Sequence, residues 1–118
     1  MKQKLQTNLP VIREVRDDQF DLLIARGILQ PGSRRFRMGK CTIIVSPPVP
    51  EANMGWHISI STPERYPTWD EVAKAWYELI PNSESREGRM ILPRMDEYVN
   101  LHNFCFHVHE EVSDAHDF

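Results

Sequence analysis

Apolar and polar residues alternate along several short stretches of this chain, and such alternation predicts β-strands. The expected strands cover residues 34–38, 41–46, 56–61, 89–92 and 104–109. In 56–61, for example, Trp56, Ile58 and Ile60 face one side and the polar residues between them face the other. Strands with one apolar and one polar face fit a sheet that is covered on one face only.

Two other stretches have the spacing of helices. A short helix is expected after Asp17 and Asp18, and Gly27 suits the position just beyond its end. Thr68 and Glu71 fit a capping box, in which each side chain binds a backbone amide at the start of a helix. They predict a second helix over about 69–80. Its apolar residues, expected to face the core, form one continuous stripe: Trp69, Val72, Ala73, Trp76, Leu79 and Ile80.

The predicted order is helix, three strands, helix and two strands, with Gly39 and Lys40 joining the first two strands as a hairpin. The expected fold class is α+β, an antiparallel sheet of about five strands with one or two helices packed on one face. A length of 118 residues suits a single domain. Within it we expect an N-terminal arm at 1–12, a turn or irregular segment at 96–103 and an acidic tail at 110–118.

The composition is that of an ordinary globular protein, with 41% hydrophobic and 26% charged residues. No apolar run approaches the ~20 residues of a membrane span, and the basic N-terminus does not lead into the apolar stretch of a signal peptide. We therefore expect no membrane association and a cytoplasmic location. Cys41 and Cys105 are then expected to be reduced, and they would be neighbours if their strands paired.

The net charge of −3 is divided unevenly along the chain. Residues 1–40 contain nine Lys and Arg against four Asp and Glu, and residues 41–118 contain five against thirteen, so the two parts carry +5 and −8. The candidate for nucleic-acid binding is a basic cluster in the first part: Arg34, Arg35, Arg37 and Lys40. Four such cations more often form a solvated strand face, so nucleic acid is the less favoured partner. The acidic part suits docking on a basic protein groove.

Histidine and cysteine are concentrated near the end of the chain. On strand 104–109, Cys105, His107 and His109 share one face, and His57 joins them if strands 56–61 and 104–109 are neighbours. Imidazole and thiolate ligands suit zinc, so these four residues are the candidate metal ligands. Their spacing matches no zinc motif, so we expect no cofactor, with zinc as the alternative.

No motif identifies catalytic residues. Ser59 and Ser61 lie on a plain strand rather than in a nucleophile elbow. His102 with Glu97 is a candidate base, but a structural role in a turn is the favoured interpretation. Aromatic and arginine side chains supply many interface hot spots. The candidate patch for contact with another protein is therefore Glu64, Arg65, Tyr66 and Tyr77.

A further set of landmarks runs through the second half of the chain. It comprises Trp-His-Ile-Ser-Ile-Ser at 56–61, Pro63, Arg65, Pro-Thr-Trp-Asp-Glu at 67–71, Glu-Tyr-Val-Asn at 97–100, His102, Asn103, Cys105 and His107. In the order and spacing of these landmarks, about residues 55–110 resemble a family of small domains of unknown function that is common in bacteriophage and prophage proteins. The resemblance implies a phage or prophage origin. It supplies no reaction and no catalytic residues.

Together these observations predict a non-enzymatic, phage-derived protein-binding module in the cytoplasm of the bacterial host. Its expected partner is a host or phage protein, and its expected role is inhibition of a bacterial defence system. One alternative is a small metal-dependent hydrolase or nuclease that uses the histidine-lined face. A second is a nucleic-acid-binding protein, and exposed edge strands make a homodimer an alternative to a monomer.

Overall fold

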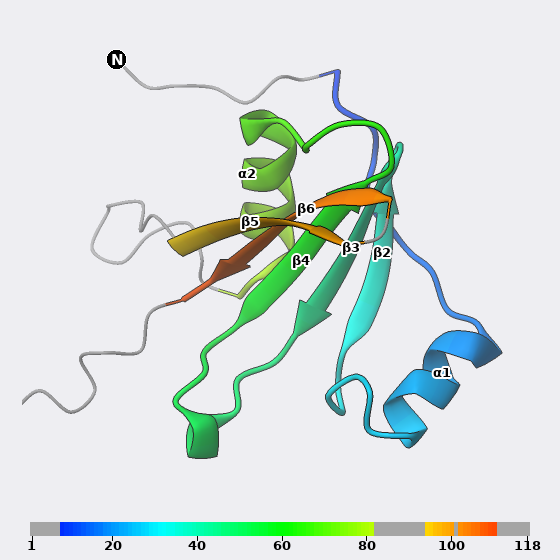
Figure 1. The fold of residues 1–118 in the computed structure, drawn as a ribbon, viewed down its shortest axis with the longest axis vertical. Coiled ribbons are helices and arrows are strands. Elements are labelled where there is room, and N and C mark those ends of the chain that lie inside the picture. The colour runs from blue at the N-terminus through cyan, green and yellow to red at the C-terminus, as the bar shows by residue number, and fades with distance from the viewer. Residues whose placement is uncertain (1–7, 82–93, 101, 111–118) are drawn as a thin grey trace, which may run out of the picture.

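The computed structural model of the chain describes residues 8–81, 94–100 and 102–110. Within these ranges, six strands form one sheet and two α-helices accompany it (Figure 1). The elements are β1 (Arg13–Glu14), α1 (Asp18–Ala25), β2 (Arg34–Met38), β3 (Cys41–Ser46), a 3₁₀ turn (Pro50–Ala52), β4 (His57–Thr62), α2 (Trp69–Leu79), β5 (Arg94–Asn100) and β6 (Asn103–His109). The α+β class is confirmed, with one strand more than expected. Neither of the described helices has the length and apolar character needed to cross a membrane.

The strand order is β1-β2-β3-β4-β6-β5, and each neighbouring pair of these strands is antiparallel. The chain leaves the sheet after β4, forms α2, and returns with the hairpin β5–β6, of which β6 pairs with β4. In that pairing Ile58 lies opposite Val108, and Ile60 lies opposite Phe106. This register places the apolar residues of both strands on the same face of the sheet.

The core lies between that face and α2. Ile43, Ile58 and Ile60 are fully buried, and they belong to one cluster with Val72 and Trp76 of the helix. Full burial of one such aliphatic side chain contributes roughly 1.5–3 kcal/mol. In Figure 1, β5 and β6 pass in front of α2, so the opposite face of the sheet is turned toward the viewer.

Helix α1 lies at the β2 side of the sheet. The Phe20 amide donates to the Asp17 carboxylate at 2.9 Å, and Gly27 follows the helix with a φ of 77°. Phe20 is buried, and the guanidinium carbon of Arg35 lies 5.1 Å from the centre of its ring. Because Arg35 alternates with the core residue Phe36 along β2, α1 packs on the side of this strand that faces away from α2.

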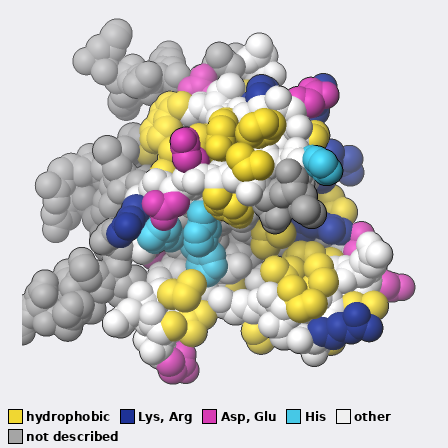
Figure 2. Space-filling view, viewed as in Figure 1, with side chains coloured by type: hydrophobic (Ala, Val, Ile, Leu, Met, Phe, Trp, Pro, Cys, Tyr) yellow, Lys and Arg dark blue, Asp and Glu magenta, His cyan; other side chains and the backbone are white. Residues whose placement is uncertain are grey.

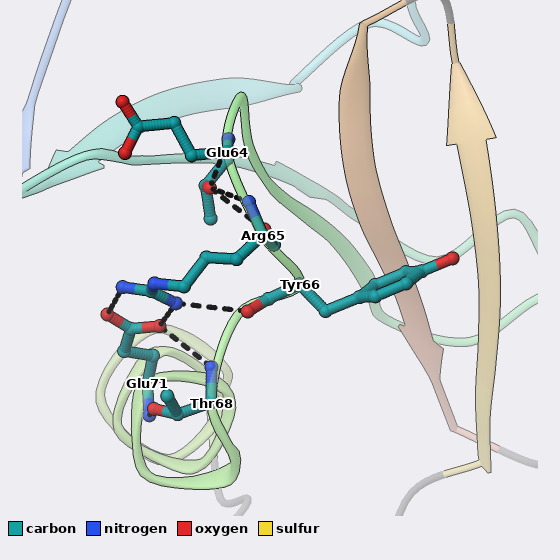
Figure 3. A network of polar contacts seen from close by, with 6 residues as sticks. Glu64, Arg65, Tyr66, Thr68 and Glu71 are labelled. Atoms are coloured by element: carbon teal, nitrogen blue, oxygen red, sulfur yellow. Dashed lines mark hydrogen bonds and ion pairs between the residues drawn. The ribbon is translucent and has the colours of Figure 1, made fainter.

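Polar contacts fix the loop between β4 and α2 (Figure 3). The predicted capping box is present: the Glu71 amide donates to Thr68 Oγ1 at 3.2 Å, and the Thr68 amide donates to Glu71 Oε1 at 2.8 Å. Arg65 donates two further hydrogen bonds to the Glu71 carboxylate, at 2.8 and 2.9 Å. These bonds from Arg65 hold the pKa of Glu71 below its ordinary value. Since Glu71 is buried, its charge depends on these partners.

The hairpin β5–β6 corrects one prediction. Most of the segment 96–103, expected to be a turn or irregular, belongs to β5. Its apolar residues Met95, Tyr98 and Val99 do not alternate, so its strand conformation comes from pairing with β6 rather than from a local pattern. Glu110, expected in the acidic tail, is also held in place, because its amide donates to the Trp56 carbonyl at 3.1 Å. The expected strand 89–92 and residues 111–118 of the expected tail lie outside the described residues.

Two side-chain placements also differ from expectation. Trp69 is 47% exposed because, as the first residue of α2, it lies at the end of the apolar stripe and outside the core cluster; Trp76 is buried there. Cys41 and Cys105 are not neighbours, because β4 separates their strands. Cys41 also faces the core, whereas Cys105 points to the other side of the sheet.

Substitution of Glu71 tests the cap of α2. Glu71→Gln is expected to lower the free energy of unfolding by about 1–3 kcal/mol, because it removes the charge that Arg65 binds. The control is Glu78→Gln, since the half-exposed Glu78 carboxylate pairs with Lys74 one turn away. Glu78→Gln is expected to lower the free energy of unfolding by no more than about 0.5 kcal/mol. Urea unfolding measures both changes, and equal losses would contradict the role given to Glu71.

Candidate functional site

Many of the polar side chains named above as candidate site residues lie on the face of the sheet that points away from α2. His57 lies opposite His109, and Ser59 lies opposite His107. On the next strand, Asp96 lies opposite His107. We call this side of the sheet the histidine face; it carries His57, Ser59, Asp96, Tyr98, His107 and His109. Figure 2 shows histidine side chains gathered in a hollow on this side of the molecule.

Three imidazole rings lie close together on the histidine face, and all three are half-buried. The ring centroid of His107 lies 5.3 Å from that of His57 and 5.4 Å from that of His109. His57 Nδ1 lies 3.2 Å from the Gly55 carbonyl, which can only accept, so this nitrogen is the donor. His109 Nε2 lies 3.3 Å from the carboxylate of Asp96.

The pKa of His107 is held below its ordinary value of 6.5. Burial contributes most, because the half-buried ring has lost hydration that a charged imidazolium needs. The neighbouring His57 and His109 lower this pKa further, whereas Asp96 acts in the opposite direction. His107 is therefore mainly neutral at neutral pH, and the centre of the histidine face is then uncharged.

The three histidines line a hollow of about 270 Å³. Its other walls come from the turn before β4 and from the residue after β6: Asn53, Met54, Gly55 and Glu110. Small-molecule pockets usually measure about 300–1,000 Å³. The hollow is thus small for a cofactor, and it suits one side chain or a few from another molecule. Met54 is 39% exposed beside it.

The candidate zinc ligands are only partly brought together. His57, His107 and His109 share the hollow, whereas Cys105 lies further along β6, opposite Ser61. Across residues 8–81, 94–100 and 102–110, no group of three or more His, Cys, Asp or Glu side chains is arranged to hold a metal ion. The zinc alternative stays a prediction.

The histidine face also carries a serine, a histidine and an aspartate in one row across the sheet: Ser59, His107 and Asp96. In a catalytic triad the hydroxyl bonds to the imidazole and the imidazole bonds to the carboxylate. Here Ser59 Oγ lies 3.4 Å from Tyr98 Oη, and Asp96 contacts His109. The row therefore forms a polar surface without the contacts that activate a nucleophile.

The residues considered as a base lie away from this row. Glu97 lies opposite Phe106, so its side chain points to the α2 side of the sheet. His102 is exposed in the turn between β5 and β6. No hydrogen bond joins Glu97 to His102 in the part of the chain that the structure describes.

The side chains of the basic cluster point to both faces of the sheet. Arg34 and Arg35 are consecutive residues of β2, so they point to opposite faces. Each member has a polar partner within the chain: Arg34 binds Glu14, Arg35 binds Asp17, Arg37 binds Thr42, and Lys40 binds Glu64. Three of these partners are carboxylates, which offset positive charge that phosphates would otherwise meet. Nucleic-acid binding stays a prediction, and this geometry does not favour it.

Most of the candidate protein-binding patch contributes to the fold. Figure 3 shows Arg65 pointing to the start of α2 and Tyr66 pointing the other way, toward β5 and β6. The Tyr66 ring lies 5.1 Å from that of Phe104 and 5.2 Å from that of Phe106, between centroids. Tyr77 is partly buried and packs against the core. A binding role for these residues stays a prediction.

A family comparison covers the part of the chain that builds the histidine face. One family model matches residues 49–113, which is more than half of the chain. The chain belongs to this family, the Domain of unknown function (DUF7694). The DUF7694 region contains β4, α2, β5 and β6, so it includes all three histidines of the face, and β1, α1, β2 and β3 precede it. The expected resemblance to a domain of unknown function is confirmed. Comparisons with curated proteins and with solved structures gave no match.

Asp96 and Tyr98 were not predicted to lie on the histidine face, because the segment that forms β5 was expected to be a turn or irregular. Tyr98 lies opposite Cys105, and its hydroxyl reaches Ser59 on the far side of β6. The Tyr98 side chain therefore spans β6 and covers Cys105, which is 4% exposed. No local signal in the sequence marks β5, because its apolar residues do not alternate.

Removal of the Tyr98 ring is expected to expose the thiol of Cys105. Tyr98→Ala should speed the reaction of Cys105 with iodoacetamide in the folded protein. Cys41 is an internal control, because it is fully buried and burial raises the pKa of its thiol to about 12, which leaves little reactive thiolate. Mass spectrometry of the labelled peptides gives both rates. An unchanged rate at Cys105 would mean that another group covers it.

Proposed function

We propose that this chain is a non-enzymatic protein-binding module that docks its partner on the histidine face. The observation that carries the proposal is the hollow lined by Met54 and the three histidines, to which neither described helix contributes a lining residue (Figure 2). Charged groups border its uncharged centre: Asp96 and Arg94 on β5 and Glu110 after β6. An apolar or aromatic centre with a polar rim is the usual composition of a protein interface.

We infer that the partner inserts an uncharged aromatic side chain into the hollow. Its volume of about 270 Å³ suits a side chain, and the neutral His107 offers no charge for an ion pair at the centre. Imidazole rings and the Met54 thioether both contact aromatic rings favourably, the sulfur contact contributing about 0.3–1.5 kcal/mol. Aromatic residues are also the commonest anchors in interface hot spots.

The wider context supports a host or phage protein as the partner. The resemblance to bacteriophage and prophage domains supports a phage origin, action in the cytoplasm of the bacterial host, and inhibition of a bacterial defence system. The charge of −8 over residues 41–118 supports a partner that is basic around the aromatic anchor. The bonding of Ser59 to Tyr98 rather than to a histidine supports a non-enzymatic role.

Met54→Lys tests the docking surface, because it places a charge in the hollow while changing a side chain that is already 39% exposed. The matched control is Leu22→Lys, which changes an exposed hydrophobic residue of α1 that does not line the hollow. Each protein is used as bait in lysate of the bacterial host and in lysate of phage-infected cells. The partner that the unmodified protein retains in stoichiometric amount is quantified by mass spectrometry, and its affinity for each purified variant is measured.

Met54→Lys is expected to weaken partner binding at least about tenfold, as for truncation of a hot spot, while Leu22→Lys binds normally. Equal affinity for all three proteins would place docking elsewhere. Failure to retain any stoichiometric partner at several salt concentrations would count against a protein-binding function altogether.

A further inference from the structure

We propose that a second hollow, between α1 and the start of β2, binds a small zwitterion: an α-amino acid with an apolar side chain. We call it the α1 hollow. It lies between Phe20, Asp21 and Ile24 of α1, Arg16 before the helix, and residues 32–35. In this proposal arginine side chains hold the carboxylate of the ligand, Asp21 holds its ammonium group, and the helix contacts its apolar side chain.

The α1 hollow has the size of a small-molecule site. Its volume is about 410 Å³, within the range of about 300–1,000 Å³ that is usual for such pockets. All of its lining residues lie between positions 14 and 35, before the region 49–113 that the family model matches. It shares no lining residue with the hollow of the histidine face. The inference is therefore independent of the proposed docking function.

Ion pairs within the chain account for several of the charges around the α1 hollow. The Arg34 guanidinium donates two hydrogen bonds to the Glu14 carboxylate, both at 2.9 Å. Arg35 donates to the Asp17 carboxylate. Each pair places one positive charge beside one negative charge, so neither pair gives the hollow a net charge.

Two further charged side chains line the hollow and have opposite signs, Arg16 and Asp21. Both are exposed, and neither side chain makes a hydrogen bond or ion pair in the part of the chain that the structure describes. Arg16 does help to lower the pKa of Glu14, but the hydrogen bond from Arg34 is the largest cause. One cation and one anion beside the same hollow suit a ligand that carries both charges.

The hydrogen bonding of Arg35 points to an acceptor from outside the chain. Its Nε is buried and has no hydrogen-bond partner among the described residues. A guanidinium group has five N–H donors, and Arg35 donates one hydrogen bond, to Asp17, while its carbon lies 5.1 Å from the centre of the Phe20 ring. Buried donors in folded proteins are nearly always paired. A carboxylate in the hollow would be such an acceptor, whereas an ammonium group would be repelled.

The apolar part of the ligand is indicated by α1. Phe20 and Ile24 are four residues apart, so they lie on the same face of the helix, and both line the hollow. Phe20 is buried, whereas Ile24 is half-buried and still offers apolar surface. A purely anionic ligand would leave Asp21 unpaired, and a charged side chain would lose its hydration against Ile24. An apolar amino acid satisfies all three parts of the hollow.

Titration of the full chain with L-leucine and with L-phenylalanine, followed by amide NMR, tests the proposal. The amide signals of Ile24, Gly32 and Ser33 are expected to shift and saturate, with a Kd of about 1 mM or below for at least one of the two. N-acetyl-L-leucine amide keeps the apolar side chain without either charge, and it is expected to bind at least about tenfold more weakly. Absence of saturable shifts with both amino acids, or equal binding of the blocked compound, would overturn the proposal.

Variants of the two unpaired charges identify the groups that hold the zwitterion. Arg16→Gln and Asp21→Asn are each expected to raise the Kd for the amino acid at least about fivefold. The matched controls are Arg13→Gln and Asp18→Asn, because both residues are exposed and neither lines the hollow; Asp18, like Asp21, lies in the first turn of α1. The controls are expected to bind like the unmodified protein. Equal affinity in all five proteins would contradict recognition of the two charges.

Met54→Lys separates this site from the proposed function. The variant changes the hollow of the histidine face and no residue of the α1 hollow, so it is expected to leave amino-acid binding unchanged. A loss of amino-acid binding in Met54→Lys would place the ligand on the histidine face and overturn the proposal. Because the titration uses the free chain, its result does not depend on whether a protein partner is found.

Discussion

The pairing of β4 with β6 determines both the core and the histidine face. Side chains on a strand alternate, so one register places Ile58 and Val108 against α2 and, at the same time, places His57 opposite His109 on the other face. A shift of one residue would expose the apolar set and bury the histidines. The hydrophobic effect that stabilises the fold therefore also positions the candidate site, although none of the three histidines of that site belongs to the core cluster.

The position of α2 is determined by polar contacts at its first turn. Glu71 is buried, and it binds both the Thr68 amide and the Arg65 guanidinium, which ties the helix to the loop that leaves β4. A buried carboxylate without these partners would be strongly unfavourable. These contacts therefore fix the conformation of the loop between β4 and α2. The loop in turn orients α2 so that its apolar stripe packs against the sheet.

The sequence predicts those elements that have a strong local signal, which is either strict alternation of apolar and polar residues or one or two residues that mark a turn or a helix start. Gly39, with a φ of 61°, permits the turn between β2 and β3, and Thr68 with Glu71 marks the start of α2. Strand β5 has no such signal, because it is polar and does not alternate, and it becomes a strand only by pairing with β6.

Only part of the candidate site could likewise be predicted from the sequence. The shared face of His57, His107 and His109 follows from alternation, once β4 and β6 are taken as neighbours. The contributions of Asp96 and Tyr98 depend on β5, so they were not predictable from local pattern. The partners of Arg34 and Arg35 were not predictable either, because Glu14 and Asp17 are about twenty residues away and only the tertiary fold brings them close.

The central claim is that the histidine face, rather than a catalytic centre, carries the function. The most direct measurement is the rate of hydrogen–deuterium exchange at the imidazole C2 position of each histidine, in the free chain and in its complex. The account predicts that exchange slows in the complex at His57, His107 and His109 and stays unchanged at His102, which lies outside the hollow. Unchanged exchange at all three histidines of the hollow in a stoichiometric complex would contradict it.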